Sequence, residues 1–172
     1  TPKPSSAASD VYKRQVETMA KIALSTEQGL DSSQLKPESI TRFKSTRAVA
    51  HAGVELAKMA KASRILVATE RGNAPRLVSS YRPGIPVTAV TNSIATARKV
   101  QLLPGVDSMV TKELDRGSLT MQAALTGLVN VGTVLPNQKI VAISGSPKAI
   151  SGMTSTARLY RVSEDGEIIG TE

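Results

Sequence analysis

The sequence contains no cysteine and no tryptophan, a single histidine, and only 2% aromatic residues. Without cysteine the chain can form no disulfide, no thiolate metal site and no cysteine nucleophile, and a reducing compartment such as the cytoplasm suits it. One histidine excludes a multi-histidine metal site, so we expect no metal ligands in this chain. Because aromatic rings are so few, nucleic-acid bases would find no platform on which to stack.

Long apolar runs and the common nucleotide motifs are also absent. No segment is apolar over a membrane-spanning length and no signal-peptide pattern occurs, so we expect a soluble chain that does not enter a membrane. Neither G-x-x-x-x-G-K-[ST] nor G-x-G-x-x-G occurs, which argues against a P-loop or a dinucleotide site. His51 lies among alanines in a predicted helix and lacks a nucleophile context, so we expect it to be structural.

The chain is basic, with 22 lysines and arginines against 14 aspartates and glutamates and a net charge of +8. That balance alone would suggest nucleic acid or another polyanion as a partner. The positive charge is dispersed, however, without a block of about five or more basic residues. A solvated basic surface is therefore the preferred interpretation, and a nucleic-acid partner, which would bind with a steep salt dependence, ranks last.

The length of 172 residues and the 40% apolar content suit one domain with a core and an appended segment. Apolar runs predict strands at residues 64–69, 86–91, 107–111, 139–144 and 157–162, and helical periods predict helices at 16–28, 39–61, 74–80, 93–102 and 115–130. This alternation predicts an α/β fold, namely a three-layer, open, five-stranded and mostly parallel sheet. The helix at 39–61 is expected to pack through a face of mostly small residues: Ala48, Ala52, Leu56, Met59 and Ala60.

Two polar loops follow covered strands and are the candidate functional segments. Thr69–Ala74 leaves the first predicted strand, and Gly145–Thr156 leaves the fourth. Because the carboxyl ends of neighbouring parallel strands share an edge, both loops should meet at one rim. Hydroxyls, backbone N–H groups and cations bind phosphate, and the loops would offer Arg71, Asn73, Lys148, Ser151, Thr154, Ser155, Thr156 and Arg158.

The turn at the first loop allows more than one interpretation. Asn73 followed by Pro75 is typical of a helix start with Asn73 as its N-cap, and a helix start beside Gly72 would attract anions. Gly72 could equally serve only as a tight turn. Both loops could also be polar segments at a sheet edge that bind no ligand.

Four short motifs occur in a fixed order along the predicted domain. They are Thr69-Glu-Arg-Gly-Asn-Ala-Pro-Arg-Leu-Val-Ser-Ser-Tyr-Arg-Pro83, Ile85-Pro-Val-Thr-Ala-Val-Thr-Asn92, Thr96-Ala-Arg98, and Gly145-Ser-Pro147 with Gly152-Met-Thr-Ser-Thr156. In order and spacing these motifs resemble the C-terminal domain of pyruvate kinase, and the resemblance runs from about Val16 to Val162. It implies that the last strand of the sheet is antiparallel.

The resemblance also implies a division of the chain. Val16-Glu-Thr-Met-Ala-Lys-Ile-Ala23 resembles the last helix of the family's catalytic barrel, so residues 16–30 are expected to be that helix and residues 38–172 the α/β domain. Residues 1–15 have no helical or strand period and partly resemble translated adapter sequence. We therefore expect them to be a disordered or artefactual tail.

Members of this family transfer a phosphoryl group from phosphoenolpyruvate to ADP in glycolysis, with Mg²⁺ and K⁺ bound on the barrel. A barrel needs about 250 residues and cannot lie within this chain, so the resemblance supplies no catalytic residue and no metal ligand. In the family the C-terminal domain binds an allosteric effector, often a sugar phosphate, and contributes to a homotetramer. The resemblance implies a regulatory and subunit-assembly domain of a cytoplasmic, ATP-binding kinase, with the missing barrel and sister subunits as partners.

The resemblance places the candidate effector site at the two loops: Thr69, Glu70, Arg71, Gly72, Asn73, Ala74, Lys148, Ser151, Gly152, Thr154, Ser155, Thr156 and Arg158. Effector-sensitive members carry several hydroxyls in the first loop, where this sequence has one hydroxyl and the carboxylate of Glu70. Unit charges about 4 Å apart repel by roughly 4 kcal/mol at an effective dielectric of about 20, which Arg71 could offset. The alternative is a free-standing α/β module that binds a phosphorylated metabolite or nucleotide.

Overall fold

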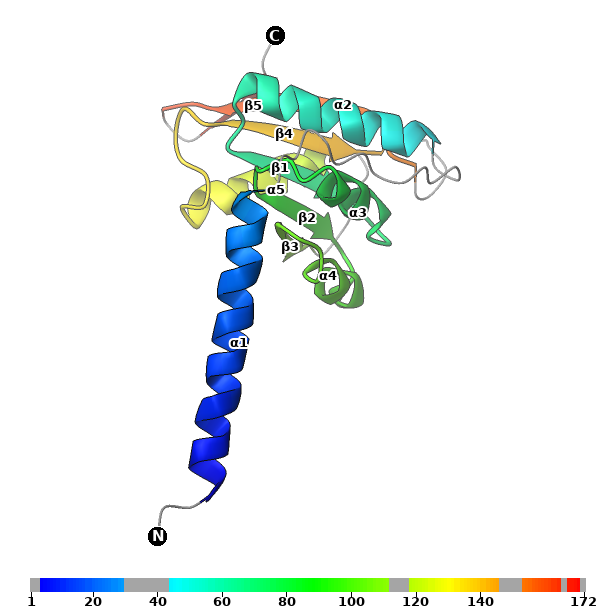
Figure 1. The fold of residues 1–172 in the computed structure, drawn as a ribbon. Helices are drawn as coiled ribbons and strands as arrows, with labels where there is room; N and C mark the ends of the chain where they lie inside the picture. Colours follow the sequence, from blue (N-terminus) through cyan, green and yellow to red (C-terminus); the bar gives the residue numbers. More distant parts are fainter. Residues whose placement is uncertain (1–3, 30–43, 112–117, 146–152, 165–166, 171–172) are drawn as a thin grey trace. The chain divides into compact units, whose positions relative to one another are not determined.

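The computed structural model describes residues 4–29, 44–111, 118–145, 153–164 and 167–170. Two compact units divide the chain, Thr1–Gln34 and Leu35–Glu172. In the first unit, helix α1 spans Pro4–Gln28 (Figure 1). It begins at Pro4 rather than at Val16, so most of the segment expected to be a tail continues the predicted helix. The domain boundaries inferred from the resemblance remain predictions.

The second unit is built on one sheet of six strands in the order β3-β2-β1-β4-β5-β6 (Figure 1). The strands are β1 Arg64–Ala68, β2 Val87–Thr91, β3 Val106–Val110, β4 Lys139–Ser144, β5 Thr156–Val162 and β6 Ile168–Gly170. The pairs β1–β2, β2–β3 and β1–β4 are parallel, whereas β4–β5 and β5–β6 are antiparallel. The mostly parallel α/β sheet is confirmed, with β6 as an additional short strand that the sequence did not predict.

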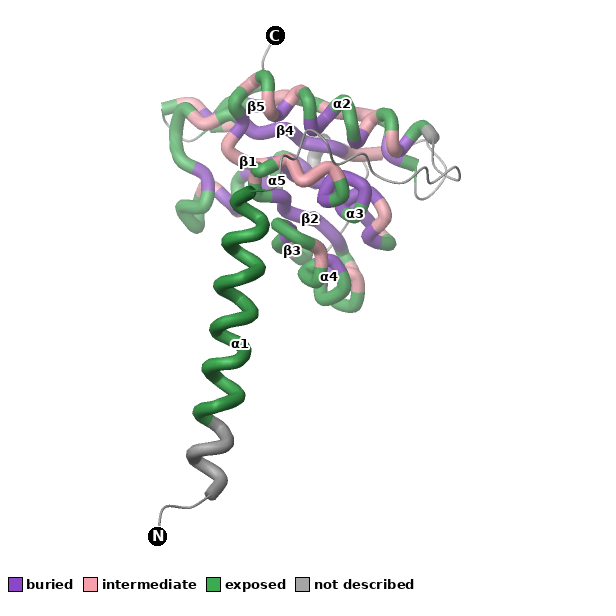
Figure 2. The backbone as a smooth tube through the Cα atoms, in the orientation of Figure 1, coloured by how far each residue is buried: buried purple, intermediate pink, exposed green. Residues whose placement is uncertain are grey.

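Helices cover both faces of this sheet, which gives the predicted three layers. One face packs against α2 Lys44–Ala60, α3 Asn73–Ser80 and α4 Ile94–Val100, and the other packs against α5 Ser118–Asn130. Successive strand residues alternate between these faces, so Ile65 and Val67 join the first core and Leu66 joins the second. Buried positions run along β1, β2 and β4 (Figure 2). No helix within the described ranges is both long and apolar enough to cross a membrane.

The buried face of α2 differs from the predicted one. Ala50, Val54 and Ala57 are fully buried, whereas Ala48, Ala52 and Met59 are exposed. Gly53 lies on the buried face, where an added Cβ would be 2.5 Å from Cδ1 of Ile143. The predicted packing face is therefore right for Leu56, which packs against the core, and wrong for Ala48, Ala52 and Met59.

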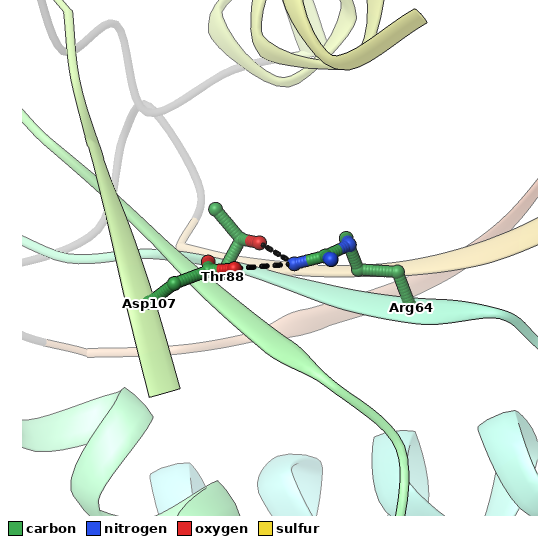
Figure 3. Close-up of polar contacts among 3 residues, drawn as sticks. All are labelled: Arg64, Thr88 and Asp107. Atoms are coloured by element: carbon green, nitrogen blue, oxygen red, sulfur yellow. Dashed lines mark hydrogen bonds and ion pairs between the residues drawn. The ribbon is translucent and has the colours of Figure 1, made fainter. Parts of the chain in front are cut away.

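A polar clamp joins the first three strands near their amino ends. Nη1 of Arg64 on β1 donates to Oγ1 of Thr88 on β2 and to Oδ2 of Asp107 on β3, each at 2.6 Å (Figure 3). Thr88 is buried, and the Arg64 side chain is 13% exposed. The guanidinium thus satisfies a buried hydroxyl and fixes β3 to the centre of the sheet.

The substitution Arg64→Met should lower the free energy of unfolding by about 1–3 kcal/mol, because the buried Thr88 hydroxyl would lose its partner. Urea denaturation followed by circular dichroism would measure the change. Arg161→Met is the matched control, since Arg161 is exposed and its hydrogen bond to Asn137 is also exposed. We expect that control to change stability by no more than about 0.5 kcal/mol. Equal effects of the two substitutions would contradict a role for the clamp.

Candidate functional site

The two polar loops leave the same edge of the sheet. β1 and β4 are parallel neighbours with Val67 opposite Ile143, so Thr69 and Gly145 both follow the carboxyl ends of adjacent strands. Thr156, the first residue of β5, pairs with Ser144 and returns the chain to that edge. We call Thr69–Ala74, Gly145 and Met153–Thr156 the carboxyl rim.

The first loop is held by hydrogen bonds to its own turn and to α4. Oγ1 of the buried Thr69 accepts from the Gly72 amide at 2.8 Å. The hydroxyl of Thr96, in the first turn of α4, donates to the Glu70 carbonyl at 2.9 Å. This backbone is therefore fixed in place, with Arg71 exposed to solvent at its tip.

Helix α3 starts one residue earlier than the capping pattern suggested. Gly72 is the N-cap, with φ of 83° in the left-handed region and no side-chain cap, and Asn73 is the first helical residue. The prediction of Asn73 as the cap was wrong, because the loop turns through a conformation that glycine adopts without strain. Pro75 lies in the first turn as expected, where its missing N–H leaves no carbonyl unpaired. Ala74 is buried in the core on the α3 face of the sheet.

The second loop is fixed to the start of α2. The amide of the buried Thr154 donates to Oγ1 of Thr46 at 3.2 Å, and the Ser155 amide donates to the Ser144 carbonyl at 3.0 Å. The hydroxyls of Ser155 and Thr156 lie 3.4 Å apart and share a hydrogen bond. Ser155 is exposed and Thr156 half-buried, so these two hydroxyls face the solvent side of the rim.

Not all of the predicted site residues meet at this rim. Arg158 lies opposite Ala142 in the sheet. It is two and four residues before Tyr160 and Val162, so it shares with them the face of β5 that packs toward α5. α3, which follows the first loop, packs against the opposite face of the sheet. Lys148, Ser151 and Gly152 lie outside the described residues.

Two residues that position the rim were missed by the sequence analysis. Thr96 occurs within the motif Thr96-Ala-Arg98, which could have indicated its contact with the first loop. Thr46 belongs to no motif, and its contact joins residues 108 positions apart. Both threonines form hydrogen bonds to backbone atoms of the loops. A sequence pattern cannot predict such contacts, because every residue carries the same backbone groups.

The rim and its surroundings bear on the kinds of site that the sequence left open. In the part of the chain that the structure describes, no group of three or more histidine, aspartate or glutamate residues could hold a metal ion. His51 is exposed on α2, and its ring centroid lies 5.1 Å from that of Tyr81. The structural role expected for it stays a prediction. The rim itself offers a guanidinium, hydroxyls and a helix start.

Known proteins similar to this chain agree with its fold. The family model described as pyruvate kinase, alpha/beta domain, matches residues 47–160. Pyruvate kinases of Staphylococcus aureus strains MRSA252 and COL are each 29% identical over 168 residues, covering 91% of this chain and 28% of the relative. A pyruvate kinase from Cryptosporidium parvum has the same fold, with a TM-score of 0.66 and 23% identity over 78% of this chain and 27% of that chain.

The chain thus spans little more than a quarter of the length of the curated relatives that it matches. The family model covers well over half of the chain, from Arg47 near the start of α2 to Tyr160 in β5. On that match the chain belongs to the pyruvate kinase alpha/beta domain family.

Proposed function

We propose that this chain is the regulatory and subunit-assembly domain of a pyruvate kinase. The parent enzyme would transfer a phosphoryl group from phosphoenolpyruvate to ADP in the cytoplasm. The observation that carries the regulatory role is the meeting of two polar loops at the carboxyl rim, each tied to a different helix. Mg²⁺ and K⁺ would act on the barrel, as the resemblance to the family implies.

A phosphorylated effector would bind between the two loops of the rim. Arg71 would supply a charge-assisted hydrogen bond, and Ser155 and Thr156 would supply hydroxyls. Because the first loop is tied to α4 through Thr96 and the second to α2 through Thr46, a ligand that draws the loops together would shift both helices. Such a shift is how binding would be relayed to the rest of the parent enzyme.

Isothermal titration calorimetry of this chain with fructose 1,6-bisphosphate, ribose 5-phosphate and AMP tests the rim. We expect at least one of these to bind, and Arg71→Ala to weaken that binding by about 10- to 100-fold, because a charged hydrogen bond is lost. Arg98→Ala is the matched control, an exposed arginine on α4 outside the rim. The rim hypothesis is lost if none of the three compounds binds, or if both substitutions act equally.

The purified chain should form no pyruvate from phosphoenolpyruvate and ADP, because the residues for that reaction belong to the barrel. A coupled assay for pyruvate, with the full-length parent as positive control, measures this. Robust turnover by the isolated chain would contradict the proposed role as a non-catalytic domain.

Helix α1 fits the same proposal. Its exposed apolar residues Val16, Met19 and Ala23 recur at spacings of three and four and lie on one side of the helix. In the parent enzyme this side would pack against the barrel, as the last helix of that domain.

A second candidate is a free-standing module that binds a phosphorylated metabolite or nucleotide. It is favoured by the sheet of the unit Leu35–Glu172, which has described helices packed on both faces. An intact gene without an upstream barrel segment would decide for this candidate.

A further inference from the structure

Two adjacent residues near the start of α2 contact different supports of the carboxyl rim. Oγ1 of the buried Thr46 accepts a hydrogen bond from the Thr154 amide of the second loop, at 3.2 Å. Nε of Arg47 donates to the hydroxyl of Tyr81 at 3.4 Å. Tyr81 is the C-cap of α3, the helix that the first loop enters at Gly72. The start of α2 is therefore bonded both to the second loop and to the helix that follows the first loop.

Helix α3 is held against α2 along its length. Leu77 and Val78 of α3 belong to the same buried core as Val54 of α2. At the end of α3, the ring centroid of Tyr81 lies 5.1 Å from that of His51, with an interplanar angle of 46°. An α-helix of eight residues is about 12 Å long and shifts as a unit. A displacement at the end of α3 therefore reaches its start, where the first loop turns.

The second loop, in turn, depends on its contact with α2. Thr154 is 5% exposed and Thr46 is 2% exposed, so opening this contact would deprive a buried amide of its partner. An added Cβ at Gly145 would lie 2.6 Å from the carbonyl oxygen of Met153. The backbone of the loop is thus close to the end of β4 and has little room to adjust when α2 moves.

We infer that the start of α2 couples the two loops of the carboxyl rim, with Thr46 and Arg47 as positioning residues that act through the loops. Loss of the contact between Arg47 and Tyr81 lets α3 shift against α2 and weakens the bond from Thr46 to the second loop. The converse also holds, because coupling free energies are reciprocal. The two loops thus keep their spacing before a ligand arrives, which lowers the cost of ordering them. The use of this coupling in effector binding rests on the proposed function, whereas the coupling itself requires no ligand.

Amide hydrogen exchange of this chain without ligand, followed by NMR, tests the coupling. Tyr81→Phe removes one hydroxyl and should speed exchange of the distant Thr154 amide about three- to tenfold. Thr46→Val should likewise speed exchange of the Gly72 amide, which donates to Thr69 within the first loop. In the double variant the two effects should not be additive, because both loosen the same helix start.

The matched controls remove the same hydroxyls at other helical sites. Tyr12→Phe changes an exposed residue of α1, which belongs to the other compact unit. Thr126→Val changes an exposed residue of α5, whose hydroxyl donates to the Gln122 carbonyl. Neither control should alter the exchange of the Thr154 or Gly72 amide.

A third amide separates local coupling from a loss of global stability. The Ile65 amide donates to the Pro86 carbonyl at 2.9 Å, and Ile65 is fully buried in the central strand β1. It should exchange at an unchanged rate in every variant that folds. Equal acceleration of this amide overturns the inference, because the effect would then be global.

The remaining outcomes separate the coupling from the proposed function. If either distant loop amide keeps its rate, the coupling is overturned, and if Thr46→Val does not fold, Tyr81→Phe decides alone. Calorimetric binding of fructose 1,6-bisphosphate by a chain whose loops exchange independently overturns the coupling and leaves the proposed function standing. Coupled loops in a chain that binds none of the three compounds support the coupling and overturn the proposed effector site.

Discussion

Replacing Leu66 with alanine should lower the free energy of unfolding by about 2–5 kcal/mol, the range for removing a large aliphatic side chain from a close-packed core. Leu66 is fully buried in the central strand β1 and packs in the core between the sheet and α5. Its neighbours across the sheet, β2 and β4, are held by backbone pairing on both sides, so the cavity could collapse only partly. Urea denaturation at constant temperature, followed by circular dichroism, would measure the change in midpoint.

The same substitution at an exposed leucine is the control for this prediction. Leu102→Ala removes the same atoms from a side chain that is 86% exposed. In the isolated chain we expect it to change stability by no more than about 0.5 kcal/mol. If Leu102→Ala destabilises the chain as much as Leu66→Ala, the assignment of the core is wrong.

The second large effect is expected at the first loop of the rim. Gly72→Ala should cost about 2–4 kcal/mol, for two separable reasons. The φ of 83° strains any residue with a Cβ, and that Cβ would lie 3.0 Å from Cγ1 of the buried Val100. Since Gly72 also donates to Thr69 Oγ1, a shift of its backbone would open the turn that carries Arg71. Thermal unfolding would measure the first effect, and calorimetric titration with a rim ligand would measure the second.

Gly84→Ala separates strain from contact. Gly84 has a φ of 70°, close to that of Gly72, and an added Cβ would have nothing within 4 Å. We expect a loss of about 1–2 kcal/mol from backbone strain alone. An equal loss for Gly72→Ala would mean that Val100 gives way, and that the contact with α4 adds nothing to the rigidity of the turn.

The strands were the most predictable part of the fold. Runs such as Ile65–Ala68 are short, apolar and continuous, and only a strand covered on both faces requires that pattern. The packing face of helix α2 was harder to predict, because small residues occur on several sides of the helix. Its buried face contains Gly53, where an added Cβ would lie 2.5 Å from Cδ1 of Ile143. β6 is three residues long and, among the described strands, pairs with β5 alone, so its sequence carries little of a strand signal.

In the candidate site, too, some features could be predicted from the sequence and others could not. The position of both loops at one edge followed from their place after parallel strands, and the register of β1 with β4 confirms it. The N-cap at Gly72 could not be read from residue preferences, because Asn73 is the better cap by type and only the path of the loop excludes it. The position of Arg158 depended on the pleat of an antiparallel strand, in which a shift by one residue changes the face. Binding of an effector at the rim stays a prediction.

The pairing of β1 with β4 also sets the order in which the domain can assemble during translation. The hydroxyl of Ser63, just before β1, donates to the carbonyl of Lys139 at the start of β4, across 76 positions of the chain. At about 5–20 residues per second, the ribosome needs roughly 4–15 s to synthesise that interval. Until β4 has been synthesised, β1 can pair with β2 on one edge, but its other edge has no strand beside it. The apolar side chains of β1 point to both faces of this incomplete sheet. The nascent chain therefore passes through an aggregation-prone stage that ends when β4 emerges.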